Sequence, residues 1–481
     1  MREIGVDGRS ILADRGTFKP AADGLKTRDP LGLPGYGPRA GDPATPDESV
    51  ATGPARIGGH EVELAEFRFD FMGGSLGWVA GERLARAMEH ASERAVPFVL
   101  RSATGGARMQ EGMVSLVQMA KMVAARDRLA RANSPFVVLF GDPTTGGVLA
   151  SLGGLADITF AEVGATLGFA GPRVAEHFTG RSLSPSSHTA EAAFGNGMVD
   201  SLVAPADASK LIARTLGVLA PDTPQDVTAP GPSPAAGEGG AWDVVQRARA
   251  PERPTGRALI AALSDETVDL KGDREGHDDP GAVCAIGRLG GRKALLIATD
   301  RARASGPGAF RKVARCIGVA ERMGLPVVTL IDTPGADPSE ESEAHGVAWS
   351  IARCLDVVLG AEVPILAVVT GEGGSGGALA LAVGDVLLAC EGSIFSVIAP
   401  EAAAAILWRD AARGPDAAHL LKPTAGQLVE LGIADSLIPS PVGAESFRAA
   451  VAYHLARLID SGPAREELPR RRRQRWRNIG P

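Results

Sequence analysis

The chain has 481 residues, of which 44% are hydrophobic and 22% are charged, and its formal net charge is −7. A chain of this length can form two or three domains with sizeable cores, and its acidic balance argues against a general nucleic-acid-binding protein. The sequence opens without a secretory signal, and no apolar run approaches the roughly 18 residues of a membrane-spanning helix. We therefore expect a cytoplasmic protein that does not enter a membrane.

The cysteines give no sign of a metal site. All four, Cys284, Cys316, Cys354 and Cys390, lie in the second half of the chain without the spacing of metal ligands. Cys284, Cys354 and Cys390 sit in apolar runs, which favours buried thiols in a reducing compartment. We predict that the protein binds no metal.

The N-terminal half begins with an irregular stretch. Residues 1–48 are rich in Gly, Pro and Asp and predict an irregular arm, followed by a first domain over 49–218. Within that domain, alternating apolar residues over 61–71 indicate strands, and 81–92 has the pattern of an amphipathic helix. Strand, glycine corner and helix then repeat through Asp200, which is typical of βα units with right-handed crossovers.

The apolar spacing of residues 113–132 predicts a further helix. It contains Met119-Ala120-Lys121-Met122, which superficially resembles a biotin-attachment motif. That motif requires a tight hairpin, whereas the flanking residues here are helical in pattern and lack turn residues. We therefore expect any biotin to arrive on another chain.

Proline, glycine and alanine dominate residues 219–240, which we predict to be an interdomain linker. A second domain is predicted over 241–465. The remaining tail, 466–481, is strongly basic. It could be a solvated or packed terminus, or it could attract phosphorylated ligands.

Glycine corners recur in both halves. Two of them lie 41 residues apart, at Gly105 and Gly146, and the same spacing separates Gly335 from Gly376. Similar closing segments, Val199-Asp200-Ser201-Leu202 and Ala434-Asp435-Ser436-Leu437, follow at an offset of about 230 residues, which indicates an internal duplication. The corners follow buried strands at Thr104–Ala107, Asp142–Ser151, Thr333–Ala336 and Gly371–Ala380.

Such corners suit the binding of negative charge. A strand that ends in glycines at a helix N-terminus presents free backbone N–H groups and the positive end of the helix dipole. It can hold a phosphate or an oxyanion that forms during a reaction. The alternative is that the glycines only allow a helix to pack closely.

These motifs resemble the carboxyltransferase component of acetyl-CoA carboxylase, in family order over most of the chain. The first half is similar to its beta subunit at Phe71–Gly77, Gly105–Gly112, Gly146–Val148 and Gly168–Val174. The second half is similar to its alpha subunit at Ile331–Ala336, Gly371–Ala380, Phe395–Glu401 and Ile406–Asp410.

The resemblance implies an α/β protein with two crotonase-like (ClpP/crotonase superfamily) ββα-superhelix domains in tandem. It also implies transfer of a carboxyl group from carboxybiotin to the α-carbon of a short acyl-CoA, foremost acetyl-CoA to malonyl-CoA. This chemistry generates two negatively charged oxygens, one on the thioester and one on biotin, so two sets of N–H donors are expected. The thioester set is Gly106, Ala107, Gly146 and Gly147, and the biotin set is Gly335, Ala336, Gly376 and Gly377.

The phosphates of coenzyme A call for basic residues. The resemblance and the neighbouring glycine motifs point to Arg108, Arg173, Arg311 and Lys312. For the two arginines of the first domain, the alternative is an ion pair with Glu111 or Glu176. No side-chain base is required, and we expect His177 and His345 to have structural or surface roles.

The sequence also departs from the family. No cysteine precedes Cys284, so the zinc ribbon that usually begins the beta subunit is missing. The segment 299–305 is shortened, and 337–341 carries acidic residues where the family has an aromatic residue and a Pro-Gly pair. Both changes fall near the expected biotin site.

The resemblance implies a separate biotin carboxylase and a biotin carboxyl carrier protein as partners, and a homodimer with its sites at the interface. Two alternatives remain open. One is a biotin-independent acyl-CoA decarboxylase or acyl-transforming relative, which the changed segments favour. The other is a non-catalytic partner subunit, against which the intact glycine corners argue.

Overall fold

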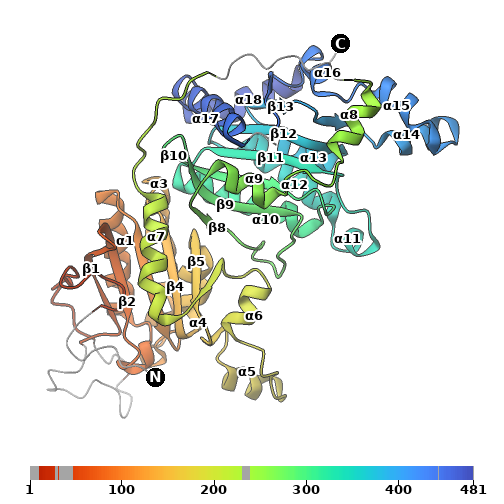
Figure 1. Cartoon of the computed structure of the whole chain (residues 1–481). Coiled ribbons are helices and arrows are strands. Elements are labelled where there is room, and N and C mark those ends of the chain that lie inside the picture. Colours follow the sequence, from red (N-terminus) through yellow and green to blue (C-terminus); the bar gives the residue numbers. More distant parts are fainter. Residues whose placement is uncertain (1–9, 28–30, 32–46, 230–238, 442–443, 480–481) are drawn as a thin grey trace. The chain divides into compact units, whose positions relative to one another are not determined.

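The computed structural model describes residues 10–27, 31, 47–229, 239–441 and 444–479. The chain divides into two compact units, Met1–Ala220 and Pro221–Pro481, and each contains one largely parallel β-sheet with helices packed against it (Figure 1). Parts of the predicted arm, 1–9, 28–30 and 32–46, lie outside the described residues, as does 230–238 of the predicted linker. No helix in the described residues combines the length and apolar composition needed to cross a bilayer.

The sheet of the first unit has the strand order β1-β2-β3-β4-β5-β7, with β6 paired to β4. Only the β1–β2 hairpin is antiparallel, and the other neighbours run parallel. The strands are β1 (Val50–Ile57), β2 (His60–Phe67), β3 (Phe98–Thr104), β4 (Phe136–Thr145), β5 (Ile158–Glu162), β6 (Leu167–Gly168) and β7 (Ser201–Val203).

The first unit contains both of the helices that the apolar spacing predicts. The helix expected over 81–92 is α1, and the one expected over 113–132 is α2 followed by α3. Lys121 lies within α3, with its Nζ 3.0 Å from Glu82 Oε2, so the Met-Ala-Lys-Met sequence is helical and forms no hairpin. The helices are α1 (Trp78–Arg94), α2 (Met113–Leu116), α3 (Gln118–Arg131), α4 (Gly146–Val148), α5 (Pro172–Thr179), α6 (Ala190–Gly195) and α7 (Ala208–Leu219).

The sheet of the second unit has the order β15-β13-β12-β11-β10-β9-β8, with β14 paired to β12. Strands β8, β9 and β10 are antiparallel, and the remaining pairs are parallel. The strands are β8 (Thr267–Asp269), β9 (Ala282–Leu289), β10 (Arg292–Thr299), β11 (Val327–Thr333), β12 (Ile365–Gly374), β13 (Val386–Cys390), β14 (Ile394–Ser396) and β15 (Ser436–Ile438).

Apolar side chains of α9 and α17 form one core with β9 to β13, because burial of that sheet face removes a large apolar area from water. Helices α10 and α12 pack against each other, and α10 also contacts β9 and β10. The helices are α8 (Ala241–Ala248), α9 (Gly256–Leu263), α10 (Pro307–Met323), α11 (Glu340–Ala344), α12 (Val347–Gly360), α13 (Ser375–Ala382), α14 (Pro400–Trp408), α15 (Gly414–Leu421), α16 (Ala425–Glu430), α17 (Ala444–Asp460) and α18 (Leu468–Arg477).

The duplication extends to individual hydrogen bonds. In the first unit Asp157 Oδ2 accepts a bond of 3.0 Å from the N–H of Phe136, the first residue of β4. In the second, Asp385 Oδ2 accepts one of 2.8 Å from Ile365, the first residue of β12. The two closing segments are also equivalent, because the aspartate of each accepts a hydrogen bond from the N–H of the second residue of a strand. Asp200 accepts from Thr159 in β5, and Asp435 accepts from Leu387 in β13.

All four cysteines are buried and none forms a disulfide, which confirms the burial predicted for Cys284, Cys354 and Cys390. Burial raises the pKa of Cys354 to about 12 and raises that of Cys390 as well. Because the thiolate is the reactive form, these side chains act as small apolar groups of the core.

Part of the basic tail forms α18, and this helix packs on the second unit. Arg472 is buried, and its Nη2 lies 2.7 Å from Asp385 Oδ2. Its other N–H groups donate to backbone carbonyls of Val358, Ala361 and Val363. The guanidinium therefore ties the C-terminal helix to the start of β12 through the aspartate that also holds Ile365.

We predict that Arg472→Ala lowers the stability of the second unit by roughly 3–5 kcal/mol, because it leaves Asp385, whose side chain is only 10% exposed, without its cation. The unfolding transitions of wild type and variant should be compared by scanning calorimetry. Arg470→Ala removes an exposed arginine of the same helix and serves as the control. Equal stability losses in the two variants would contradict the prediction.

Candidate active site

The two glycine corners of the first unit are in backbone contact. One follows β3 and the other connects β4 to α4, and Gly106 and Gly146 have φ of +108° and +66°. A Cβ on Gly146 would lie 2.8 Å from Gly106 Cα, and a Cβ on Gly106 would lie 3.2 Å from Gly146 Cα. A side chain at either position would force the corners apart. Glycine is therefore required for two reasons: the positive φ and the lack of space for a Cβ.

Two of the four predicted donors in this unit are used by the fold. Gly106 N–H donates to Thr104 Oγ1 at 3.0 Å, and Gly146 N–H donates to Phe169 O at 2.9 Å. The N–H groups of Ala107 and Gly147 make no hydrogen bond in the described part of the chain. They lie on the two chains that touch, so this pair remains available to an anion.

The second unit repeats this arrangement. Gly335 has φ of +130° and donates its N–H to Thr333 Oγ1 at 3.2 Å. A Cβ on Gly377 would lie 2.6 Å from Ala336 N, so the corner after β11 touches the start of α13. Among the described residues, nothing accepts a hydrogen bond from the N–H groups of Ala336, Gly376 or Gly377.

The hydrogen bonds shift the alignment of the two halves by one residue. In the first unit Leu76 N–H donates to Gly106 O, and in the second Ser305 N–H donates to Gly335 O. Gly335 therefore corresponds to Gly106, whereas the equal spacing in the sequence pairs it with Gly105. The unbonded amides then match as well: Ala107 and Gly147 correspond to Ala336 and Gly376.

Both long strands run further than the sequence predicts. β4 continues to Thr145 and β12 to Gly374, where a turn is expected. Their last residues pair with the short strands β6 and β14. This pairing keeps each chain extended up to the start of the helix that carries the Gly147 or Gly376 amide.

A buried carboxylate supports the corner of the second unit. Asp332, in β11, accepts a hydrogen bond of 2.9 Å on Oδ1 from Glu372 N–H in β12. A Cβ on Gly371 would overlap the same carboxylate. Because Ala336 and Gly376 each lie four residues beyond one end of this bond, Asp332 fixes the spacing between the chains that carry them.

Arginines from the segment after α8 complete this support. Arg253 donates to Thr370 O, and its Nε lies 3.6 Å from Asp332 Oδ2. Arg249 donates twice to Glu372 Oε1, at 2.9 and 2.7 Å, and once to Glu401 Oε1 at 2.8 Å. Burial nevertheless raises the pKa of Asp332 to about 6, which the hydrogen bond from Glu372 and the charge of Arg253 only partly oppose.

Arg108, predicted to contact coenzyme A, is instead fully buried. Its guanidinium binds Glu48, lies 3.0 Å from Glu111 Oε1 and donates to Ser75 O. The ion pair with Glu111 is the structural alternative stated above. In this conformation the side chain has no surface to offer to a phosphate.

The other predicted basic residues differ in availability. Lys312 is 3% exposed and donates to Asp279 O and Ala282 O, so its role is also structural. Arg311 Nε lies 2.8 Å from Asp273 Oδ2. Arg173, on α5, is exposed, and no ion pair involves it in the described part of the chain.

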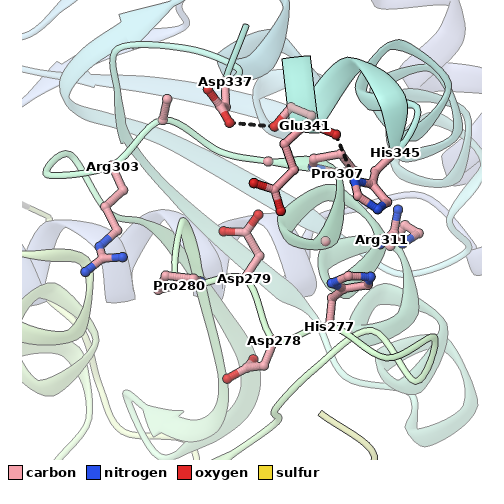
Figure 2. A pocket seen from close by; sticks show the side chains of 14 residues that line it. His277, Asp278, Asp279, Pro280, Arg303, Pro307, Arg311, Asp337, Glu341 and His345 are labelled. Carbon is pink, nitrogen blue, oxygen red and sulfur yellow. Dashed lines mark hydrogen bonds between the residues drawn. The ribbon is translucent and has the colours of Figure 1, made fainter. Parts of the chain in front are cut away.

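A cavity of about 530 Å³ lies in the second unit at the start of α10 (Figure 2). Its lining includes Asp337, which directly follows Ala336, and Arg303, which belongs to the shortened segment 299–305. His345 also lines it, with Nδ1 2.8 Å from Glu341 O, whereas His177 is exposed on α5. Neither histidine reaches a corner amide through a hydrogen bond described for this structure.

Sequence reasoning missed the supporting residues Asp332, Arg253 and Arg249. Asp332 stands within the Ile-Asp-Thr-Pro-Gly motif, near the end of a buried strand. A charged residue in such an apolar strand needs partners, and this could have marked Asp332 as a residue that supports the corner. The two arginines lie far away in the sequence, and only the tertiary contacts reveal them. The described residues contain no group of three or more His, Cys, Asp or Glu side chains suited to a metal ion.

Comparison with known proteins gives consistent matches. The family described as acetyl co-enzyme A carboxylase carboxyltransferase-like matches residues 238–480. Subunits beta/alpha of the acetyl-coenzyme A carboxylase carboxyl transferase of Salinispora arenicola (strain CNS-205) are 40% identical over 509 positions, covering 98% of this chain and 89% of that protein. A protein of Mycobacterium bovis described as a probable biotin-dependent acyl-coenzyme A carboxylase beta3 subunit is 34% identical, with 90% of each chain covered.

Among solved structures, transcarboxylase 12S with methylmalonyl-coenzyme A and methylmalonic acid bound has a TM-score of 0.74 to this chain. It is 23% identical and the match covers 94% of this chain and 88% of that one. This likeness, together with the two mixed sheets, confirms the expected fold of two crotonase-like α/β domains in tandem.

The raised pKa of Asp332 predicts a pH-dependent cost to stability. Since its folded-state pKa of about 6 lies above the ordinary value of 3.8, the native state holds the proton longer than the unfolded chain does. Stability therefore falls as the pH rises through that window, by on the order of 3 kcal/mol. Asp332→Asn should remove this dependence, so that the variant gains stability relative to wild type between about pH 4 and pH 7.

The measurement is the difference in melting temperature between Asp332→Asn and wild type across that range. Asp356→Asn, at an exposed position of α12, controls for the loss of one carboxylate. A difference that stays constant with pH would show that Asp332 is not the titrating group.

Proposed function

Because the chain belongs to the acetyl-CoA carboxylase carboxyltransferase family, we propose that it moves a carboxyl group from carboxybiotin to the α-carbon of a short acyl-CoA. The carboxyltransferase activity follows from the family, and acetyl-CoA, giving malonyl-CoA, is the substrate we propose. The observation that carries the proposal is the pair of unbonded backbone N–H groups in each unit, Ala107 with Gly147 and Ala336 with Gly376.

In the first unit we assign Ala107 and Gly147 to the thioester oxygen. When the α-proton leaves an acyl-CoA, negative charge moves onto this oxygen, and two preorganised N–H donors stabilise it. One donor of this kind is typically worth about 3 kcal/mol in the transition state. The donors need no rearrangement, because the contact between the corners already holds both chains.

In the second unit we assign Ala336 and Gly376 to the ureido oxygen of biotin. Bound carboxybiotin would supply the carboxyl group that is transferred. The residues fit this group in two respects: two amides lack an internal acceptor, and a Cβ on Gly376 would meet no atom within 4 Å, so a ring can approach it. Asp332 and Arg253 hold the chains that carry the two amides.

For coenzyme A, exposed Arg173 is the proposed phosphate contact, with Arg311 as the second. We further propose that the chain works with a separate biotin carboxylase and a biotin carboxyl carrier protein, and that it forms a homodimer. Exposed apolar side chains on two short helices support an interface, since Phe178 on α5 is 90% exposed and Ile406 on α14 is 71% exposed.

Substitution of the open glycine tests the biotin-side donors. Gly376→Ala should fold normally, because the new methyl group meets nothing and the backbone φ is not positive. The methyl group obstructs the approach to the donor, so we expect carboxyl transfer to fall by up to about a hundredfold, the usual value of one such donor. Initial rates of malonyl-CoA formation measure this effect.

Gly195→Ala is the matched control, because Gly195 also has open space for a Cβ and lies at the end of α6. An unchanged rate in Gly376→Ala would contradict the assignment of this amide.

The reverse reaction separates the proposal from its main alternative. We expect the purified chain to remove the carboxyl group of malonyl-CoA only when free biotin or biocytin is added, since the second unit then receives its acceptor. Release of acetyl-CoA with and without biocytin is followed chromatographically. Biotin-independent loss would identify a decarboxylase, and no turnover together with no acyl-CoA binding would indicate a non-catalytic subunit.

A further inference from the structure

A buried arginine directly follows Ala107, the residue whose N–H is assigned to the thioester oxygen. Arg108 and its partner Glu48 are fully buried, and its second carboxylate partner, Glu111, is buried as well. Arg108 Nη1 lies 3.2 Å from Glu48 Oε2 and 3.0 Å from Glu111 Oε1, and Nη2 donates to Glu48 Oε1. Although burial acts in the opposite direction, the hydrogen bond and charge of Arg108 hold the pKa of Glu48 below its ordinary value. These three side chains form a buried charged cluster, called the Arg108 cluster below.

The backbone beside this cluster carries the donor. Ala107 forms a parallel bridge with Leu76, in which Leu76 N–H donates to Gly106 O and Arg108 N–H donates to Leu76 O, both at 2.8 Å. The bridge therefore uses polar groups of the residues on either side of Ala107. In a parallel pairing of this kind, the N–H of the bridged residue itself points away from its partner. The direction of the Ala107 N–H thus depends on how firmly its chain is held against Leu76.

The Arg108 cluster holds the same pair of chains through side chains. Arg108 donates to Ser75 O at 2.8 Å through Nη2 and to Ser75 Oγ at 3.1 Å through Nε. Glu111 Oε2 accepts the N–H of Trp78 at 2.5 Å. A Cβ on Gly77 would overlap both Arg108 Nη1 and Glu111 Oε1, so segment 75–78 lies directly against the cluster. Both ends of the segment to which Ala107 is bridged are therefore fixed by charged side chains.

The cluster also joins the N-terminal arm to this segment. Glu48 is the last residue of the predicted arm, and Thr27 of the arm donates its hydroxyl to Glu48 Oε2. Thr27 Oγ1 also accepts a hydrogen bond of 3.3 Å from Arg108 Nη1. Ser49, which follows Glu48, donates to Ser75 O at 2.8 Å. Contacts from the arm thus reach the chain that lies behind the donor.

The second unit has the same backbone bridge with a different side chain beside it. Ser305 is bridged to Ala336, and Asp337 N–H donates to Ser305 O at 3.0 Å. Asp337 therefore takes the chain position of Arg108. Its carboxylate accepts hydrogen bonds of 2.7 and 2.5 Å from two serine hydroxyls at the start of α11. The guanidinium is thus an addition to the duplicated backbone, made on the thioester side.

We propose that Arg108 is a positioning residue for the thioester-side donor. Together with Glu48 of the arm, it fixes the direction of the Ala107 N–H by holding segment 75–78 against the corner. A guanidinium suits this role because its five N–H groups in one plane can reach two carboxylates and a carbonyl at once, whereas the ammonium of lysine has three donors. The inference rests on the proposed function, since that function assigns the Ala107 N–H to the thioester oxygen.

Two variants of the full chain test this role in the biocytin-dependent decarboxylation of malonyl-CoA. Arg108→Lys keeps the charge and loses the planar donor set, and Glu48→Gln removes the charge that the arm supplies. We expect each to lower kcat by about tenfold or more and to leave KM for malonyl-CoA nearly unchanged, because the donor acts mainly in the transition state. The double variant should lose no more than the stronger single variant, since the two residues act as one unit.

Arg83→Lys is the matched control, because Arg83 is a second buried arginine that ties the arm to the first unit. Its Nε lies 2.8 Å from Asp23 Oδ2, its Nη2 lies 3.0 Å from Asp47 Oδ2, and its Nη1 donates to Val50 O at 3.0 Å. We expect Arg83→Lys to lower the melting temperature by an amount similar to that of Arg108→Lys, and to leave kcat unchanged. The comparison separates the loss of positioning from a general loss of stability.

Deuterium uptake by the backbone amides of residues 105–112 measures the positioning without turnover. Uptake should be faster in Arg108→Lys and Glu48→Gln than in wild type and Arg83→Lys. Unchanged uptake, an unchanged kcat, or equal losses of kcat in Arg108→Lys and Arg83→Lys would overturn the inference. Should Arg108→Lys not fold, Glu48→Gln is judged by the same outcomes. A wild type without biocytin-dependent turnover refutes the proposed function, whereas normal wild-type turnover with an unchanged kcat in the variants refutes this inference alone.

Discussion

Everything at the two corners depends on backbone chains that approach each other without side chains between them. Gly106 lies so close to Gly146 that a single methyl group would not fit, and in the second unit a Cβ on Gly377 would lie 2.6 Å from Ala336 N. The chains that touch carry the unbonded N–H groups, whereas the N–H groups of Gly106, Gly146 and Gly335 donate to acceptors within the fold. Unpaired amides next to satisfied ones are costly in a fold and useful in a binding site.

The two units support the same contact by different means. In the first, a neutral hydrogen bond of 2.8 Å between Ser102 and Thr144 joins β3 to β4. In the second, the charged side chain of Asp332 joins β11 to β12 with help from Arg253. A buried charge is more demanding, since its desolvation must be offset by partners, and this explains why the second unit needs an arginine from a distant segment.

A difference in length between the copies is absorbed close to the site. Phe136 and the aspartate that binds it are 21 positions apart, whereas Ile365 and its aspartate are 20 apart. The additional residue of the first unit coincides with a π-helical turn at Leu149–Gly153, directly after α4. A π turn takes up one residue without breaking the helix, so the amide of Gly147 keeps its place at the helix start.

The sequence by itself determined the two-unit α/β architecture, the internal duplication, the glycine corners and the family. Apolar periodicity and glycine spacing are local features that can be recognised in the sequence alone. The tertiary structure decided which of the eight predicted amides are unbonded, since Gly106, Gly146 and Gly335 find acceptors in Thr104, Phe169 and Thr333. It also buried Arg108 and Lys312 and brought Asp332 to the corner. A motif states which residues are present, but hydrogen-bond partners and burial come from segments that are distant in sequence and meet only in the folded chain.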